Sequence, residues 1–305
     1  MPQPPVAVPL PHRGVLAVTG TDTVSFLNSV TSNDTTAVTG ETTIWSAFLT
    51  PQGKFQHEFF AAAPPPGHPD AGGLWLECEA ERREHLRKRL AVYRLRSRVS
   101  LADRGEDLAV AALLGERALG LLDLPALEGF TRRLGNGVAF VDPRLGQLGA
   151  RAILPRGELE STLDAAGFAV DHALETYDGQ RLALGVPDGS RDLEVERATL
   201  MESGFDELRG IDWNKGCFMG QELTARMKYR GLAKKRLLPV RLDGPAPPPG
   251  TQVRRNGKVA GTLRSAVNGV GIALLRLDAL DGPETRGLEA GDAALTAHKP
   301  PWANF

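Results

Sequence analysis

Two Asn-Gly dipeptides constrain the fold of the C-terminal part of this chain more than any other feature. Asn256-Gly257 and Asn268-Gly269 each lie between runs that are rich in β-branched and apolar residues. Asn-Gly is a preferred sequence for a two-residue β-hairpin turn, because both residues adopt positive φ at low cost. A proline-rich stretch, Asp243–Gly250, precedes the first hairpin. We therefore predict that 236–305 form a separate antiparallel β-barrel or sandwich, with its later strands within Gln252–Ala297.

Strand-like and helix-like patterns alternate through residues 1–235, which predicts an α+β body. A chain of 305 residues is long enough for such a body to divide further. We expect one part near 1–100, completed by some of the C-terminal half, and a second part at 101–235. The expected strands are Val15–Val18, Thr43–Thr50, Phe55–Phe60, Leu74–Cys78, Leu108–Leu114, Val138–Val141 and Leu148–Leu154. One expected helix is capped by Thr21 or Asp22 and buries Phe26, Leu27 and Val30; the others span Glu81–Arg96, Arg117–Leu122, Gly157–Ala166 and His172–Leu184.

Charge and motif content exclude several functional classes. The net charge of −1 argues against a global attraction to nucleic acid, and no apolar run is long enough to cross a membrane. The proline-rich start, Pro2–Pro11, is not typical of a signal peptide. Two cysteines are too few for a disulfide framework and lack metal-binding spacing, which favours a reducing, cytoplasmic location. No nucleotide-binding glycine motif or His-Glu-x-x-His is present, so nucleotide and metal chemistry are not expected.

Residues 211–231 are the stretch with the most concentrated chemistry. Gly216 and Gly220 flank Cys217, and a helix-like run follows. Glycine permits the tight turn that would present the sulfur at the start of this helix. A helix N-terminus favours the thiolate form by about 0.3–1 kcal/mol. The alternative is a tight loop in which a small cysteine is buried for packing alone.

Lys215–Glu222 resembles the Lys-Gly-Cys-aromatic-x-Gly-Gln-Glu motif of the YgfZ-type folate-binding proteins, and Arg226–Gly231 fits the same family. These proteins act in iron–sulfur protein maturation and are related to the glycine-cleavage T-protein, an aminomethyltransferase. The resemblance extends to Phe26–Asn28 and to Ser32–Asp34. It implies two related α+β parts around a central folate channel, followed by a β-barrel.

The resemblance also implies a site. Cys217 would be the functional thiol, with Lys215 and the helix start favouring the thiolate. Tetrahydrofolate or another reduced folate would be the cofactor. In the hairpin turn 51–54, Gln52 and Lys54 are further candidates, although a solvated turn is an equal alternative. The expected folate-binding residues are Asn33, Asp34, Gly216, Gly220, Gln221, Glu222 and Arg226.

Two departures from the T-protein pattern bear on whether the protein is an enzyme. In T-proteins a catalytic aspartate follows the strand that corresponds to Leu74–Cys78, yet Glu79–Arg98 contains no aspartate. A second T-protein acid corresponds here to Ala183. Carboxylates at such positions carry acid–base or electrostatic work. We therefore expect a folate-binding accessory protein for assembly or repair of iron–sulfur proteins, including tRNA-modifying enzymes; the alternative is a tetrahydrofolate-dependent aminomethyltransferase or other one-carbon transferase.

Arg226–Arg241 holds seven basic residues and no acidic one. Such a run is typical of a solvated face, or of a clamp for the glutamyl carboxylates of folate. Direct binding of nucleic acid is not expected, since no interleaved aromatic residues or RNA-reading motif accompany the run. The expected partners are folate and iron–sulfur client proteins or assembly factors, with no membrane.

Overall fold

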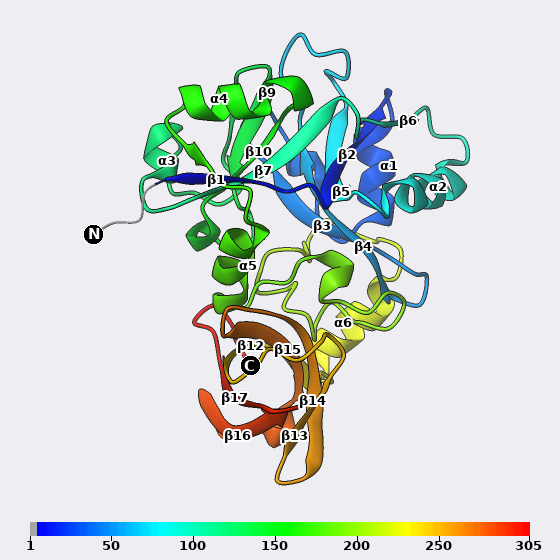
Figure 1. The fold of residues 1–305 in the computed structure, drawn as a ribbon. Coiled ribbons are helices and arrows are strands. Elements are labelled where there is room, and N and C mark those ends of the chain that lie inside the picture. Colours follow the sequence, from blue (N-terminus) through cyan, green and yellow to red (C-terminus); the bar gives the residue numbers. More distant parts are fainter. Residues whose placement is uncertain (1–4) are drawn as a thin grey trace. The chain divides into compact units, whose positions relative to one another are not determined.

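The computed structural model describes residues 5–305 (Figure 1). The chain divides into two compact units, and each unit combines segments that are distant in the sequence. The motif segment 211–231 begins in unit 1 and ends in unit 2. Unit 1 holds the described residues up to Leu49, Gln56–Leu174 and Arg209–Met219; unit 2 holds Thr50–Phe55, Glu175–Leu208 and Gly220–Phe305.

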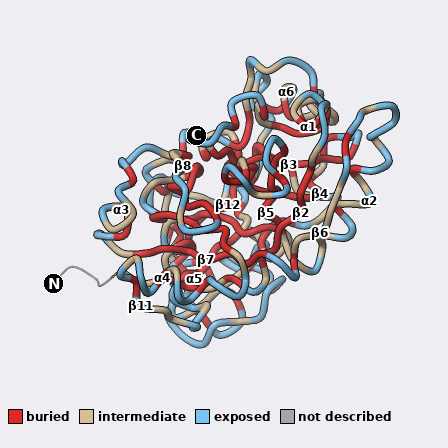
Figure 2. The backbone as a smooth tube through the Cα atoms, turned by 90° about the horizontal axis from the view of Figure 1, so that it is seen from above, coloured by how far each residue is buried: buried red, intermediate tan, exposed pale blue. Residues whose placement is uncertain are grey.

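The first sheet of unit 1 has five strands. Helices α1 (Thr23–Val30) and α2 (Arg83–Arg94) add apolar side chains to its core, among them Phe26, Leu27 and Leu90. Figure 2 shows that the strands of this unit are largely buried. The strand order is β3 (Ile44–Leu49), β4 (Phe55–Ala62), β5 (Leu74–Glu79), β2 (Arg13–Thr19) and β6 (Ser100–Asp103).

The second sheet of unit 1 has six strands and its own apolar core. Every residue of its strand β7 (Leu108–Leu114) is buried, and the short helices α3 (Ala118–Leu121) and α4 (Leu159–Ala165) pack side chains against the same core. Among the described residues, only β1 (Val6–Pro9) and β11 (Ala169–Val170) pair in parallel in this sheet, and its other strand pairs are antiparallel. The strand order is β11 (Ala169–Val170), β1 (Val6–Pro9), β7 (Leu108–Leu114), β10 (Ala150–Pro155), β9 (Gly137–Val141) and β8 (Thr131–Leu134).

Buried charges connect the two sheets of unit 1. Glu77 on β5 accepts hydrogen bonds from Arg13 on β2 and from Arg151 on β10. The ring of Phe60 lies between guanidinium groups, 4.4 Å from that of Arg151 and 4.8 Å from that of Arg144. Because buried charges are tolerated only when they are paired and hydrogen-bonded, these residues depend strongly on one another.

Unit 2 contains helices α5 (Leu174–Ala183) and α6 (Gln221–Tyr229) and a closed barrel of six strands (Figure 1). The barrel interior is filled by small and branched apolar side chains, including Val253, Leu263 and Leu275. Around the barrel the strands follow the order β12 (Lys235–Asp243), β15 (Val270–Arg276), β14 (Lys258–Val267), β13 (Gln252–Arg255), β16 (Glu284–Ala290) and β17 (Ala293–His298).

The structure confirms the α+β class, the C-terminal antiparallel barrel and both hairpin turns. Asn256 and Asn268 have φ of 50° and 48°, and each following glycine is also at positive φ, as a two-residue hairpin turn requires. No helix among residues 5–305 is long and apolar enough to cross a membrane.

Several details differ from the expectations. The barrel begins at Lys235, one residue before the predicted boundary, and its first strand, β12, which the sequence did not predict as a strand, is the second half of the basic run. The proline-rich start contains strand β1, which pairs with β7. Asp22 precedes α1 but its carboxylate accepts from the backbone N–H of Arg98 rather than capping the helix. Five short 3₁₀ helices were also not predicted: Thr35–Ala37, Gly146–Leu148, Arg156–Glu158, Gly189–Arg191 and Leu277–Ala279.

Candidate functional site

The cysteine loop lies along the C-terminal end of α1, within unit 1. The backbone N–H of Asp212 donates to Ser32 O at 3.1 Å, and that of Met219 donates to Ser29 O at 3.2 Å. These two contacts attach both ends of the segment 212–219 to the same helix end. The loop is therefore held by its flanks while its middle residues remain irregular.

Lys215 attaches the centre of the loop to the C-terminal end of α1. Its Nζ donates to the backbone carbonyls of Asn28 and Thr31, the latter at 2.7 Å, and lies 5.0 Å from the centre of the Phe218 ring. The last carbonyls of a helix lack partners within the helix and carry partial negative charge, so an ammonium group satisfies them well. Burial lowers the pKa of Lys215 to about 8, opposed by the charges of Asp34 and Asp212. These contacts give Lys215 a positioning role in the loop.

The two cysteines have opposite environments. Cys217 is exposed, whereas Cys78 on β5 is 1% exposed, and burial raises the pKa of its thiol. Phe218, the neighbour of Cys217, is buried and anchors the loop. The loop therefore presents Cys217 to solvent, so the alternative of a cysteine buried for packing is wrong for this residue.

Asn33 and Asp34 belong to the same unit as Cys217, and both are engaged in turns. The side-chain amide of Asn33 donates to Trp45 O at 2.7 Å and to Arg209 O at 2.8 Å, which ties the exit of α1 to the segment before the cysteine loop. The carboxylate of Asp34 accepts from the backbone and hydroxyl of Thr36. Unit 1 thus brings together Asn33, Asp34, Lys215, Gly216 and Cys217.

The remaining site residues lie in unit 2, at the start of α6. Gly220 occupies the position before the helix at φ 78°, a left-handed conformation that favours glycine. Glu222 lies in the first turn of α6 and pairs with Arg226 one turn later. Gln221 is the first helical residue.

The hairpin turn that follows β3 packs against this helix start within unit 2. A Cβ atom at Gly53, whose φ is +80°, would lie 2.6 Å from Gly220 O and 2.7 Å from the Cβ of Leu223. Only glycine therefore permits this close approach. Gln52 is exposed and Lys54 is partly buried at the same turn.

Two residues that shape the loop were missed from the sequence. Asp212 Oδ1 accepts from the backbone N–H groups of Asn214 and Lys215, at 2.6 and 2.9 Å. Ser32 donates its hydroxyl to Gly210 O at 2.6 Å. An aspartate two residues before an asparagine signals such a turn locally, but the partner of Ser32 is distant in the sequence.

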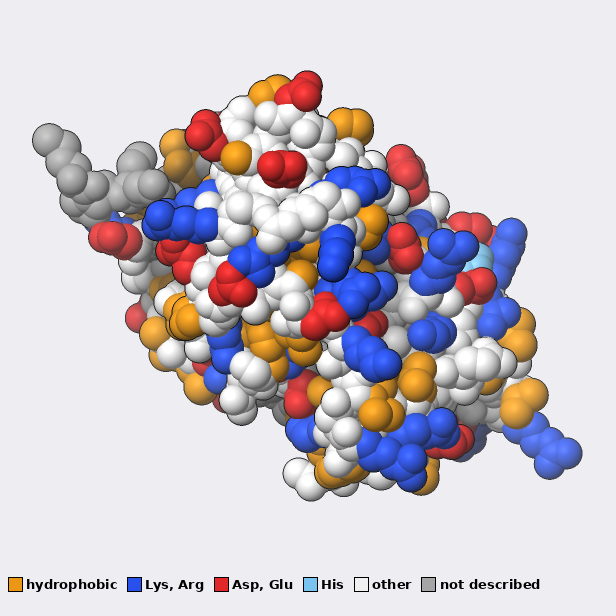
Figure 3. Space-filling view, turned by 90° about the horizontal axis from the view of Figure 1, so that it is seen from below, with side chains coloured by type: hydrophobic (Ala, Val, Ile, Leu, Met, Phe, Trp, Pro, Cys, Tyr) orange, Lys and Arg blue, Asp and Glu red, His pale blue; other side chains and the backbone are white. Residues whose placement is uncertain are grey.

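The basic run 226–241 does not form one cationic surface. Lys228 pairs with Asp206, and Arg236 is buried and pairs with Glu207. Arg226 is paired with Glu222, as described above. On the face drawn in Figure 3, basic and acidic side chains lie next to one another in many places. Arg226 is exposed although it is paired, and four other basic residues of the run are exposed as well: Arg230, Lys234, Lys235 and Arg241.

Comparison with known proteins gives a consistent result. Residues 234–305 match the C-terminal β-barrel domain of the CAF17 family. Over 96% of its length the chain is 31% identical to the human mitochondrial iron–sulfur cluster assembly factor IBA57, and 30% identical to the mouse protein, covering 84% of each. Among solved structures, the glycine cleavage system aminomethyltransferase T from Bartonella henselae aligns with a TM-score of 0.77 at 17% identity, covering 98% of this chain and 86% of that protein. The fold is therefore aminomethyltransferase-like, α+β with a C-terminal six-stranded antiparallel barrel.

Proposed function

The chain belongs to the IBA57 family of iron–sulfur cluster assembly factors, and we propose from this premise that it acts on iron–sulfur proteins through Cys217. The observation that carries the proposal is the contrast between the two thiols. Cys217 is exposed on a loop that Lys215 and the end of α1 hold in place, and Cys78 is buried. Only Cys217 is therefore positioned to meet another molecule.

The chemistry of a single exposed thiol limits what it does. A thiolate is a soft ligand that suits iron–sulfur clusters, and such clusters are commonly held by four cysteine thiolates. This chain has two cysteines, one of which is buried. We therefore propose that Cys217 contributes one ligand to a cluster in transit, and that a client protein or assembly factor contributes the others.

Replacing Cys217 with serine is expected to abolish this role without unfolding the protein. In cells that lack the endogenous factor, the activity of a [4Fe–4S] client enzyme should fall to the level of an empty vector, because a hydroxyl is a poor ligand for this iron. The measurement is client activity normalised to client protein.

The matched control is Cys78→Ala, which removes the other thiol and should retain client activity. Iodoacetamide labelling of the wild type, resolved by mass spectrometry, should modify Cys217 in the folded protein and Cys78 only after unfolding. Full client activity with Cys217→Ser, or labelling of Cys78 first, would count against the proposal.

A reduced folate is proposed as the second ligand, on the strength of the motif resemblance. The candidates in unit 1 are Asn33, Asp34 and Gly216, while Gly220, Gln221, Glu222 and Arg226 are the candidates in unit 2. The structure records Asn33 and Asp34 in structural turns, so their contribution would be to shape the folate site through backbone geometry.

Isothermal titration with tetrahydrofolate is expected to show saturable binding at micromolar or tighter affinity, which corresponds to about 8 kcal/mol or more. The same samples are expected not to form methylene-tetrahydrofolate from aminomethylated carrier protein, because Ala183 replaces a T-protein acid. No heat at millimolar folate would remove folate from the proposal. Product formation above a heat-treated control would favour the aminomethyltransferase alternative.

Two finer points are also proposed. The clients are proposed to include iron–sulfur enzymes that modify tRNA, with no direct contact between this chain and RNA. We also propose that the protein acts in the cytoplasm, because its two cysteines are typical of a reducing compartment. The human and mouse relatives are mitochondrial proteins.

A further inference from the structure

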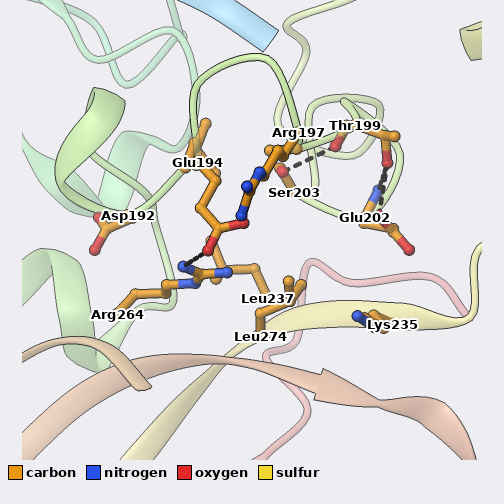
Figure 4. A pocket seen from close by; sticks show the side chains of 12 residues that line it. Asp192, Glu194, Arg197, Thr199, Glu202, Ser203, Lys235, Leu237, Arg264 and Leu274 are labelled. Atoms are coloured by element: carbon orange, nitrogen blue, oxygen red, sulfur yellow. Dashed lines mark hydrogen bonds and ion pairs between the residues drawn. The ribbon is translucent and has the colours of Figure 1, made fainter. Parts of the chain in front are cut away.

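A polar pocket of about 170 Å³ lies within unit 2, apart from the cysteine loop in the sequence. Figure 4 shows that the segment 192–203, which follows the 3₁₀ helix after α5, forms one side of it. Barrel strands β12, β14 and β15 form the other side through Lys235, Leu237, Arg264 and Leu274. At roughly 30 Å³ per water molecule, its volume corresponds to about five or six waters, or one small organic acid.

Three cations line this pocket, and of these Arg264 forms an ion pair with Glu194. Arg264 Nη1 donates to Glu194 Oε1 at 2.8 Å, but Arg264 Nε is buried and has no acceptor among residues 5–305. The side chains of Arg197 and Lys235 are exposed, and neither forms an ion pair with any described residue. The exposed side chains of Arg197 and Lys235 therefore offer hydrogen-bond donors that the acids of the pocket do not use.

The acidic residues of the pocket are mostly engaged elsewhere. Asp192 accepts from Arg181 at 2.6 Å and from Ser265 at 2.5 Å. Glu202 accepts from the hydroxyl of Thr199 at 2.9 Å. Glu194 alone faces the cations, and its side chain remains 45% exposed.

Glu194 marks the point on which the cations converge. The pKa of Glu194 lies below its usual value, because Arg264 donates a hydrogen bond to its carboxylate. The positive charges of Arg264, Arg197 and Lys235 lower this pKa further. The carboxylate of Glu194 therefore lies where the same three cations would also stabilise the carboxylate of a bound molecule. The side chain of Glu194 is flexible and half-exposed, so a ligand can displace it. Planar guanidinium groups match carboxylates particularly well.

We propose that this pocket binds a small hydroxy- or amino-carboxylic acid, with its carboxylate on Arg264 in place of that of Glu194. Arg197 and Lys235, which are exposed, bind the other oxygen of the ligand's carboxylate. The hydroxyl or ammonium group of the ligand donates to Glu202, which retains acceptor capacity beyond its bond from Thr199. Glu202 also disfavours a phosphate dianion, because the second negative charge of the phosphate would lie close to its carboxylate.

The probes are L-lactate and L-alanine, which distinguish a hydroxy acid from an amino acid, with propionate and inorganic phosphate for comparison. Chemical shifts of residues 192–203 in the full-length protein, followed by ¹H–¹⁵N NMR, report binding. Lactate or alanine is expected to saturate these shifts with a Kd of about 0.1–10 mM, and propionate is expected to bind at least about threefold more weakly.

Three substitutions and two controls separate the pocket from general charge effects. Glu194→Gln removes the tethered competitor and is expected to tighten binding about tenfold, whereas Glu196→Gln, two residues away, should leave it unchanged. Lys235→Gln is expected to weaken binding several-fold, with Lys234→Gln as its control. Arg264→Gln is expected to weaken binding more than tenfold. If Arg264→Gln fails to fold, the exposed Lys235 pair still tests the proposal.

Two results would overturn this assignment. One is the absence of saturable shifts at 192–203 up to about 50 mM of both acids, a concentration well above the expected Kd range. The other is phosphate binding as tightly as either acid, or a Kd that Glu194→Gln and Lys235→Gln leave unchanged. None of these measurements depends on Cys217, so this proposal and the proposed function fail independently.

Discussion

Replacing Glu77 with alanine is expected to lower the free energy of unfolding by about 3–5 kcal/mol. The side chain of Glu77 is fully buried, and its two oxygens accept from Arg13 and Arg151. Its removal leaves two guanidinium groups in an interior that cannot hydrate them. Glu58 remains as a partner of Arg13, but it also accepts from the indole N–H of Trp45. Urea denaturation at pH 7, followed by circular dichroism, measures the loss.

The control for Glu77→Ala is Glu84→Ala on α2. Glu84 forms ion pairs with Arg87 and Lys88, yet its side chain is 49% exposed. Exposed ion pairs contribute little, since water screens them in both the folded and the unfolded state. The midpoint for Glu84→Ala should therefore stay close to the wild type. A loss below about 1 kcal/mol for Glu77→Ala would show that the buried cluster is not interdependent.

Lowering the pH from 6.5 to 5 is expected to cost about 2 kcal/mol of stability through His57 alone. His57 on β4 is 1% exposed, and burial, with the charges of Arg82, His85 and Arg89, lowers its pKa to about 2. The unfolded chain takes up a proton at this residue near pH 6.5, whereas the folded chain stays neutral there until about pH 2. The unfolded state therefore binds more protons below pH 6.5, and stability falls as the pH decreases.

The comparison that isolates this effect is His57→Phe, which keeps an aromatic ring beside Phe48 and removes the titrating group. The variant also loses the 2.8 Å contact between His57 Nε2 and His85 Nδ1, so its absolute stability will differ. Its pH dependence between 6.5 and 5 should nevertheless be flatter than that of the wild type. His172→Gln, whose side chain is 69% exposed, should leave the wild-type slope in place. Parallel slopes for the wild type and His57→Phe would contradict the prediction.

Local features of the fold were predictable because their cause lies within a few residues. The turns at Asn256 and Asn268 depend on positive φ at adjacent positions, and the strands Leu74–Cys78 and Leu108–Leu114 depend on short apolar runs. Strand β12 was missed because its first residues read as part of a basic run. Arg236 is buried in that strand only because Glu207, far away in the sequence, neutralises it.

The sequence named residues for a candidate site but could not give their contacts. The motif named Cys217 and Lys215, whereas the burial of Cys78 is a finding of the structure. The sequence could not show that the ammonium of Lys215 lies on the carbonyls of Asn28 and Thr31. Nor could it identify the pocket around Arg264, whose lining comes from two distant segments.

The sequence by itself determined the α+β class, the C-terminal barrel and the turn positions, because periodicity and turn chemistry are local properties. Only the tertiary structure decided which charges are buried and which are exposed. Glu77 and Glu84 are the same residue type, yet one joins two sheets and the other lies on a helix surface. Burial and pairing depend on residues that folding brings together from distant positions, so the energies of Glu77, His57 and Arg264 follow from the fold rather than from their neighbours in the chain.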